Sequence, residues 1–145
     1  MRAILAFMFC AVTVASAQSI HAQDSASEVE AVKPIVGGAN AAVNAQKLDE
    51  MLAFYADDAK IDSKAAARQV SKQEYGVAMK TVFDRHALNR ADVTSLTAKL
   101  TDATHATVDG TVYIHLTNGN RAGGQNQWKL EKREGRWLIV ETKYQ

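Results

Sequence analysis

The sequence predicts an α+β fold in which N-terminal helices pack on one face of an antiparallel sheet. Two observations support this prediction. Apolar residues recur at helical spacing in the first half of the chain, and from Ala91 onward the period changes to two. Helices that precede a run of antiparallel strands are typical of α+β domains.

Length and composition indicate one ordered domain. The chain has 145 residues, with 47% hydrophobic and 23% charged residues, which is ordinary for a globular protein. Its 17 Lys and Arg stand against 16 Asp and Glu. This balance gives no electrostatic footprint for nucleic acid or an anionic membrane, so we expect neither as a partner.

Residues 1–17 predict a secretory signal peptide that is cleaved. A basic start, an uncharged apolar run and Ala15-Ser16-Ala17 occur in the expected order, and Ile20-His21-Ala22 is a second candidate cleavage site. The alternative is a buried N-terminal helix. The run is too short to span a bilayer. We therefore expect a periplasmic or secreted bacterial protein without a stable membrane anchor.

Cleavage after Ala17 would also remove Cys10, the one cysteine of the chain. A mature chain without cysteine has no thiol nucleophile and no cysteine-ligated metal site. Residues 18–31 are polar and predict a flexible tether, which leaves 32–145 as the folded domain.

Two helices are expected in the first half of this domain. Ser27 and Glu30 fit a capping box, and Pro34 fits a first turn. An apolar helical stripe follows, with Leu48, Met51, Leu52 and Tyr55, and we expect the helix to end at Asp57-Asp58. A short strand is expected over 59–62. Ser71 and Glu74 fit a second capping box, which opens a helix ending near Arg85-His86.

Strands follow from Ala91. The longest alternating row holds Ala106, Val108, Gly110, Val112, Ile114 and Leu116, which predicts a sheet with one face on a core. Asn118-Gly119 and Glu134-Gly135 predict two hairpin turns. In the last strand, alternation places Glu141 on the face of Trp137 and Ile139. The opposite face carries Leu138, Val140, Thr142 and Tyr144, and we expect a second subunit to cover it.

Two motifs resemble the nuclear transport factor 2-like superfamily, in particular its SnoaL-like branch. Tyr55-Ala56-Asp57-Asp58-Ala59 is similar to the first-helix signature, and Gly135-Arg136-Trp137-Leu138-Ile139 to the last hairpin. The resemblance covers residues 32–144. It implies a cone-shaped α+β roll with a pocket inside the cone and a homodimer formed through the sheet. Many members have Gly-Asp where Gln46-Lys47 stands, so we expect the helix break there to be built differently.

The ketosteroid isomerases of this superfamily provide a test for catalysis. Alignment through Asn44-Ala45 and Ala56-Asp57-Asp58-Ala59 places their tyrosine on Ala39 and their aspartate base on Ser63, with Asp62 one residue early. Proton transfer next to a carbonyl needs both groups. The resemblance therefore implies no isomerase of that kind, and the sequence does not establish an enzyme.

The remaining candidates are few. Glu141 is the first candidate acid or base if its face is concave, since burial would raise its pKa. Asp62 is the second, and Tyr55, Asn126 and Trp128 are candidate pocket residues, the last two on one face of their strand. His105 and His115 share a strand face but lie too far apart to bind one metal ion, and we expect no metal and no cofactor.

Three functions stay open. The first is an exported module that binds a small, mostly apolar molecule in its cone. The second is a cofactor-free lyase or isomerase that uses a pocket carboxylate. The third is a purely structural dimerisation module.

Overall fold

The computed structural model describes residues 17–63 and 67–145. Its elements in chain order are α1 (Ala17–Asn44), α2 (Leu48–Leu52), β1 (Tyr55–Ser63), β2 (Arg68–Ser71), α3 (Lys72–Asp84), β3 (Leu88–Leu100), β4 (His105–Leu116), β5 (Arg121–Arg133) and β6 (Arg136–Tyr144). The expected signal peptide, apart from Ala17, lies outside the described residues.

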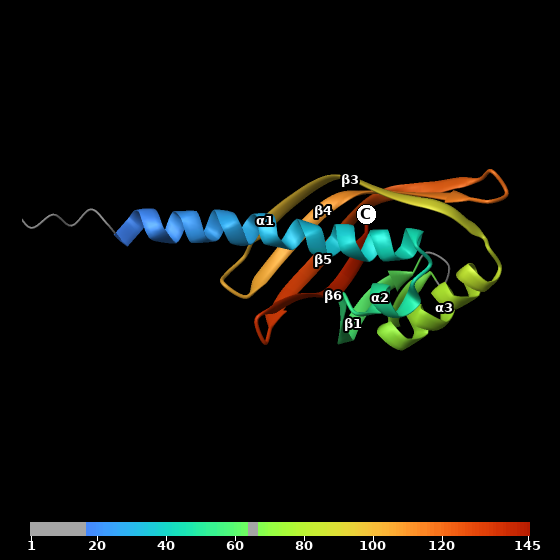
Figure 1. Ribbon diagram of the computed structural model, residues 1–145, viewed down its shortest axis with the longest axis horizontal. Helices are drawn as coiled ribbons and strands as arrows, with labels where there is room; N and C mark the ends of the chain where they lie inside the picture. Colours follow the sequence, from blue (N-terminus) through green and yellow to red (C-terminus); the bar gives the residue numbers. More distant parts are fainter. Residues whose placement is uncertain (1–16, 64–66) are drawn as a thin grey trace, which may run out of the picture.

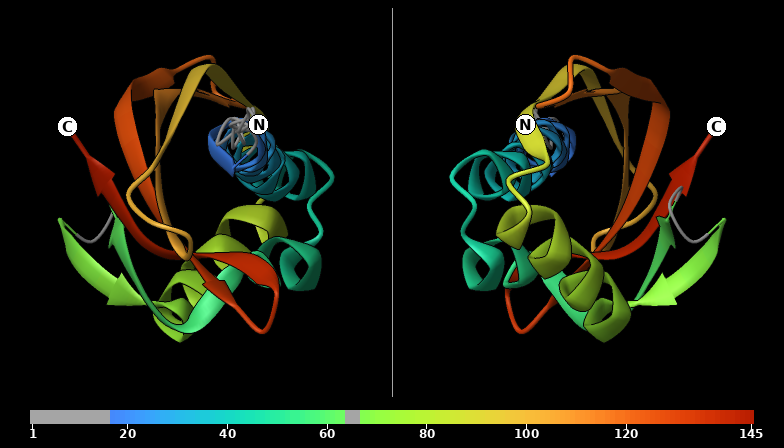
Figure 2. Two further views of the ribbon diagram at one scale, coloured as in Figure 1. Left: turned by 90° about the vertical axis from the view of Figure 1, so that its left-hand side faces the viewer. Right: turned by 90° about the vertical axis from the view of Figure 1, so that its right-hand side faces the viewer.

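The six strands form one curved sheet in the order β2-β1-β6-β5-β4-β3 (Figure 1). Strands β1 and β6 are parallel, and the other neighbours are antiparallel. Seen end-on, the sheet curves around and the helices lie along its open side (Figure 2). The predicted α+β fold class is confirmed. Within the described ranges, no helix has the length and apolar character needed to cross a membrane.

Helix α1 is longer than the sequence signals indicate. It runs through residues 18–31, so the expected tether is helical and Ser27 is not a helix start. This stretch contains no glycine or proline that would stop a helix. Pro34, expected in a first turn, lies inside α1. Glu28 is tied to the sheet, because its carboxylate accepts hydrogen bonds from Lys132 Nζ at 2.7 Å and Trp137 Nε1 at 2.9 Å.

The end of α1 shows how the helix break is built without glycine. The Lys47 N–H donates to the Ala42 carbonyl at 2.9 Å and the Gln46 N–H to the Val43 carbonyl at 3.0 Å. This is the Schellman pattern, in which the residue after the helix adopts a positive φ. Gln46 takes that position with φ 56°. A side chain therefore occupies a conformation that favours glycine.

The helix that the sequence predicts up to Asp57-Asp58 ends earlier. Helix α2 ends at Leu52, and Tyr55, Asp57 and Asp58 lie in β1, so the expected helix terminus at the two aspartates is wrong. Pairing with β6 overrides the helical spacing. The Ile139 N–H donates to the Phe54 carbonyl at 2.9 Å, and Tyr55 is the register partner of Ile139.

The local signals in the second half are confirmed. Helix α3 begins with the predicted capping box, in which Ser71 Oγ accepts from the Glu74 N–H and the Glu74 carboxylate accepts from the Ser71 N–H. The β4–β5 turn contains Gly119 at φ 86°, and the β5–β6 turn has positive φ at both Glu134 and Gly135. Positive φ at both central residues is typical of a type I′ hairpin.

A register shift in β6 decides which side chains face the core. Leu130 of β5 pairs with Ile139, whereas Lys129 pairs with Glu141, so Val140 is an extra residue on β6. Such a bulge reverses the alternation beyond it. Trp137 and Ile139 face the helices, and after the bulge Thr142 does so in place of Glu141. The expectation that Glu141 shares a face with Trp137 is wrong.

The core lies between the concave face of the sheet and the helices. Val32, Val36, Ala39 and Ala42 form the inward stripe of α1, and all are at most 5% exposed. The opposing surface of the core consists of Trp128, Leu130 and Ile139. Met51 of α2 is fully buried in the same core. Side chains therefore fill this part of the concave face.

Candidate functional site

The structure separates the residues that the sequence singled out. Tyr55, Asn126 and Trp128 are buried, and the latter two share the concave face of β5. Glu141 lies on the convex face. Its carboxylate pairs with Lys129 and Lys143, and the hydrogen bond from Lys129 holds the pKa of Glu141 below its usual range. Glu141 therefore does not meet the condition of a concave position on which we based its candidacy.

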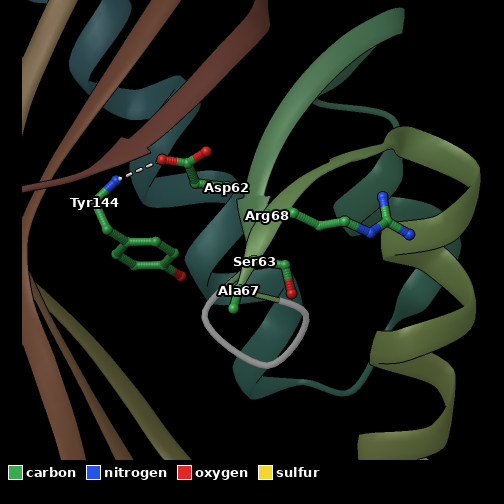
Figure 3. Close-up of a pocket in the computed structure, with 5 residues that line it drawn as sticks. All are labelled: Asp62, Ser63, Ala67, Arg68 and Tyr144. Atoms are coloured by element: carbon green, nitrogen blue, oxygen red, sulfur yellow. Dashed lines mark hydrogen bonds between the residues drawn. The ribbon is translucent and has the colours of Figure 1, made fainter.

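A small cavity lies where the end of β1 parts from the end of β6 (Figure 3). Its volume is about 190 Å³, and Asp62, Ser63, Ala67, Arg68 and Tyr144 line it. We call it the β1–β6 pocket. Cavities for drug-sized ligands measure roughly 300–1,000 Å³, so an occupant of the β1–β6 pocket is a small molecule. Asp62 and Ser63 both line the pocket because β1 ends at Ser63.

The polar groups of this pocket differ in their availability. Asp62 Oδ2 accepts from the Tyr144 N–H at 3.3 Å, and the Asp62 N–H donates to Thr142 Oγ1 at 3.1 Å. The Arg68 guanidinium points away from both Asp62 and Tyr144 (Figure 3) and donates to Glu74 at 2.7 Å. Asp62 is therefore the carboxylate that a pocket ligand would meet.

Three tyrosines link the β1–β6 pocket to the interior. The rings of Tyr55 and Tyr75 are 5.7 Å apart and tilted by 55°. Burial is the main cause that raises the pKa of Tyr55, Tyr75 and Tyr144, and the Asp62 carboxylate adds to it at Tyr144. The three hydroxyl groups therefore stay neutral near pH 7. We call Tyr55, Tyr75 and Tyr144 the tyrosine cluster.

Asn126 is the unusual polar residue of the concave face. It is 6% exposed, and among the described residues its Oδ1 atom has no hydrogen-bond partner. Asn126 is the register partner of Gly110 on one side and of Tyr144 on the other. Cross-strand partners on one face have Cβ atoms roughly 5 Å apart. The unpartnered amide therefore lies beside a residue that lines the β1–β6 pocket.

A second cavity, of about 500 Å³, lies near the β5–β6 turn. Lys72, Arg133, Arg136, Asp57 and Glu134 contribute its charged groups, and its apolar lining includes Leu138. Two of the three cations already have partners, since Lys72 pairs with Asp57 and Arg133 with Asp58. The charges of this groove largely neutralise each other, so it favours no ligand class.

The histidines of β4 lie far apart, as their spacing requires. His105 is exposed and bonds Asp102 in the preceding turn, whereas His115 contacts Asp92 across the sheet at 3.1 Å. Over residues 17–63 and 67–145, no group of three or more His, Cys, Asp or Glu side chains is arranged to hold a metal ion.

Sequence reasoning missed two members of the site. Tyr75 fits a core position of an amphipathic helix, and Tyr144 was assigned to the face of Leu138 because alternation was continued through Val140. No sequence signal marks that bulge. Ala39, where the isomerase tyrosine would stand, is a buried residue of α1 and offers no hydroxyl group.

Comparison with known proteins identifies relatives of the fold. A family model described as "SnoaL-like domain" matches residues 24–143. No curated protein sequence matches the chain significantly. An NTF-2-like protein of unknown function from Shewanella oneidensis MR-1 has a TM-score of 0.67 at 19% identity, over 77% of this chain and 93% of its own.

Two further similar structures come from Novosphingobium aromaticivorans, one of them from strain DSM 12444. One is provisionally assigned as a scytalone dehydratase, with a TM-score of 0.71 at 12% identity over 83% of this chain and 85% of its own. The other is provisionally assigned as an aromatic ring hydroxylase, with a TM-score of 0.67 at 15% identity over 80% and 86%. At these identities the likeness shows the fold alone.

Proposed function

The chain belongs to the SnoaL-like domain family, and from this premise we propose that it binds a small, mostly apolar molecule at the β1–β6 pocket. The observation that supports the proposal most is the pocket wall itself. Tyr144, one of the three residues of the tyrosine cluster, and Asp62, with its carboxylate, both line this wall. An apolar body with one polar group fits such a site, because ligand pockets combine apolar lining with few polar groups.

Charge supports a neutral ligand. Asp62 would repel an anion, and Arg68, the cation of the pocket, is already paired with Glu74. Burial disfavours ionisation of the tyrosine cluster, and it disfavours an ionised ligand beside the cluster for the same reason.

Native mass spectrometry of protein purified gently from its own host tests the proposal. We expect wild-type protein to carry a reproducible extra mass. Tyr144→Trp enlarges the ring that lines the pocket and should remove that mass. Tyr113→Trp, on the convex face of β4, should retain it. A bare wild-type protein that also binds neither phenol nor toluene in isothermal titration calorimetry would contradict the proposal.

A second candidate function is a cofactor-free lyase or isomerase that uses Asp62 as its acid or base. The specific observation is that the Asp62 carboxylate lines the pocket with one bond, to a backbone N–H. A general base has to reach a proton of the substrate, and the position of Asp62 on the pocket wall supports that role. Asp62→Asn should abolish any turnover that the protein shows. Turnover unchanged in that variant would exclude this assignment.

Export and dimerisation complete the proposal. The N-terminal pattern of charge, apolar run and cleavage motif supports export to the periplasm or medium. Half-buried Leu138 and Val140 on the convex face support a homodimer through the sheet, and a purely structural dimer is what remains if no ligand binds. The same native mass spectra report the cleaved mass and the subunit number.

A further inference from the structure

Asp62 contributes a carboxylate to the β1–β6 pocket, and within residues 17–63 and 67–145 no cation pairs with it. Arg68 lines the same pocket, but its guanidinium points away from Asp62 (Figure 3) and pairs with Glu74 at 2.7 Å. Lys143 lies on the neighbouring strand β6, and it pairs with Glu141 at 3.2 Å. The negative charge of Asp62 is therefore left for an occupant of the pocket.

The Asp62 carboxylate also has unused capacity to accept hydrogen bonds. An ionised carboxylate offers about four lone-pair positions. Among the described residues one donor uses them, because the Tyr144 N–H reaches Oδ2 at 3.3 Å, which is long for an N–H···O bond. The other oxygen, Oδ1, accepts no bond from a described residue (Figure 3). A half-buried carboxylate in this state is stabilised by any further donor that reaches it.

The rest of the pocket wall restricts the molecule that brings this donor. The cavity of about 190 Å³ limits the ligand to a small molecule, and Tyr144 and Ala67 provide apolar lining. An ammonium group would lose its hydration beside the buried tyrosine cluster, whereas a neutral hydroxyl has less hydration to lose. Hydrogen bonds from a hydroxyl to a carboxylate are short and about twice as strong as neutral ones.

We propose that Asp62 is the specificity-determining residue of the β1–β6 pocket and that its carboxylate accepts a hydrogen bond from a neutral hydroxyl group of the ligand. The ligand class is a small phenol or alcohol with an apolar body. This inference rests on the proposed binding function and adds the ligand class to it. It does not depend on the acid–base role of Asp62 in the second candidate function.

Two pairs of probes test the two parts of this inference. Phenol and toluene have nearly the same shape, and only phenol donates a hydrogen bond. Benzyl alcohol and benzylamine both donate, and benzylamine is a cation at pH 7. Binding of each probe to the full chain is measured at pH 7 by isothermal titration calorimetry and ligand-observed NMR. We expect benzyl alcohol to bind more tightly than benzylamine.

Asp62→Leu keeps the branching at Cγ and removes both acceptor oxygens. We expect the ratio of phenol affinity to toluene affinity to fall at least about tenfold, the factor that corresponds to a hydrogen bond to a charged group. Asp62→Asn is a milder variant, because its amide oxygen can keep the bond from the Tyr144 N–H. Its amide nitrogen then donates where a carboxylate oxygen accepted, so the ratio should fall there too.

The matched control is Asp49→Asn, an exposed aspartate of α2, which should leave the phenol-to-toluene ratio unchanged. Thermal unfolding shows whether each Asp62 variant retains the fold. A ratio that stays unchanged in a folded Asp62 variant overturns the role of Asp62 and leaves the binding function standing. Tighter binding of benzylamine than of benzyl alcohol overturns the neutral ligand class. If no probe binds wild-type protein and no ligand is retained from the host, the binding function itself fails.

Discussion

Replacing Asn126 by leucine should make the ligand-free protein more stable. Both side chains branch at Cγ and contain four heavy atoms, so the exchange conserves shape inside the concave face. The exchange removes no hydrogen bond of the amide oxygen, because Oδ1 has no partner among the described residues. Removing an unsatisfied buried acceptor should therefore raise the free energy of unfolding by about 1–3 kcal/mol.

Urea unfolding, followed by tryptophan fluorescence and far-UV circular dichroism, measures this change. The midpoint should move to higher urea with an unchanged m value, since the surface exposed on unfolding stays the same. The exposed control Asn89→Leu should stay within about 0.5 kcal/mol of wild type. Core substitutions usually destabilise, so a gain of stability at a buried position is a distinctive result.

The opposite result would refute the reasoning. If Asn126→Leu lowers the stability by 1 kcal/mol or more with the m value unchanged, the amide must have a partner in solution, such as a bridging water. The acceptor would then be satisfied in the folded protein, and the premise of an unsatisfied amide oxygen at Asn126 would be wrong.

Three further predictions concern the scaffold. Gln46→Gly should raise the unfolding free energy by up to about 1 kcal/mol in urea titration, because glycine adopts the positive φ at the end of α1 without strain. Glu141→Gln should lower stability at pH 7. The depressed pKa of Glu141 means that its stabilising effect is present above the unfolded-chain pKa of about 4.5, so the difference from wild type should vanish as acid titration proceeds below it. Glu28→Gln should weaken the contacts of α1 to Lys132 and Trp137. We therefore expect a shift in the fluorescence of Trp137 and faster proteolysis of the first part of α1. Unchanged cleavage rates would contradict the role of Glu28 in attaching α1 to the sheet.

Local chemistry made the second half of the fold predictable. The Ser71–Glu74 capping box, the Asn118-Gly119 turn and the Glu134-Gly135 turn each depend on residues adjacent in sequence, and each is confirmed. Elements that depend on tertiary partners were predicted less well. The spacing that ends at Tyr55 is helical, yet that residue forms the start of β1 because β6 offers a parallel partner.

The candidate site shows the same division. Asn126 and Trp128 were placed correctly on one face because β5 pairs with β4 in unbroken register. Tyr144 and Glu141 were exchanged because their faces depend on the bulge at Val140, which no turn residue or glycine announces. Alternation predicts a face only as far as the next irregularity of the strand.

That bulge decides the chemistry of the β1–β6 pocket. Without the extra residue, Glu141 and Lys143 would face the concave side, and two charges would enter an apolar interior at high cost. With it, Thr142 and Tyr144 face inward, so Thr142 bonds the Asp62 N–H and Tyr144 stands beside Asn126. The carboxylate is left outside, where Lys129 and Lys143 neutralise it. One inserted residue thus replaces a charged concave surface with neutral hydroxyl groups, and this favours the recognition of neutral molecules over acid–base chemistry by Glu141.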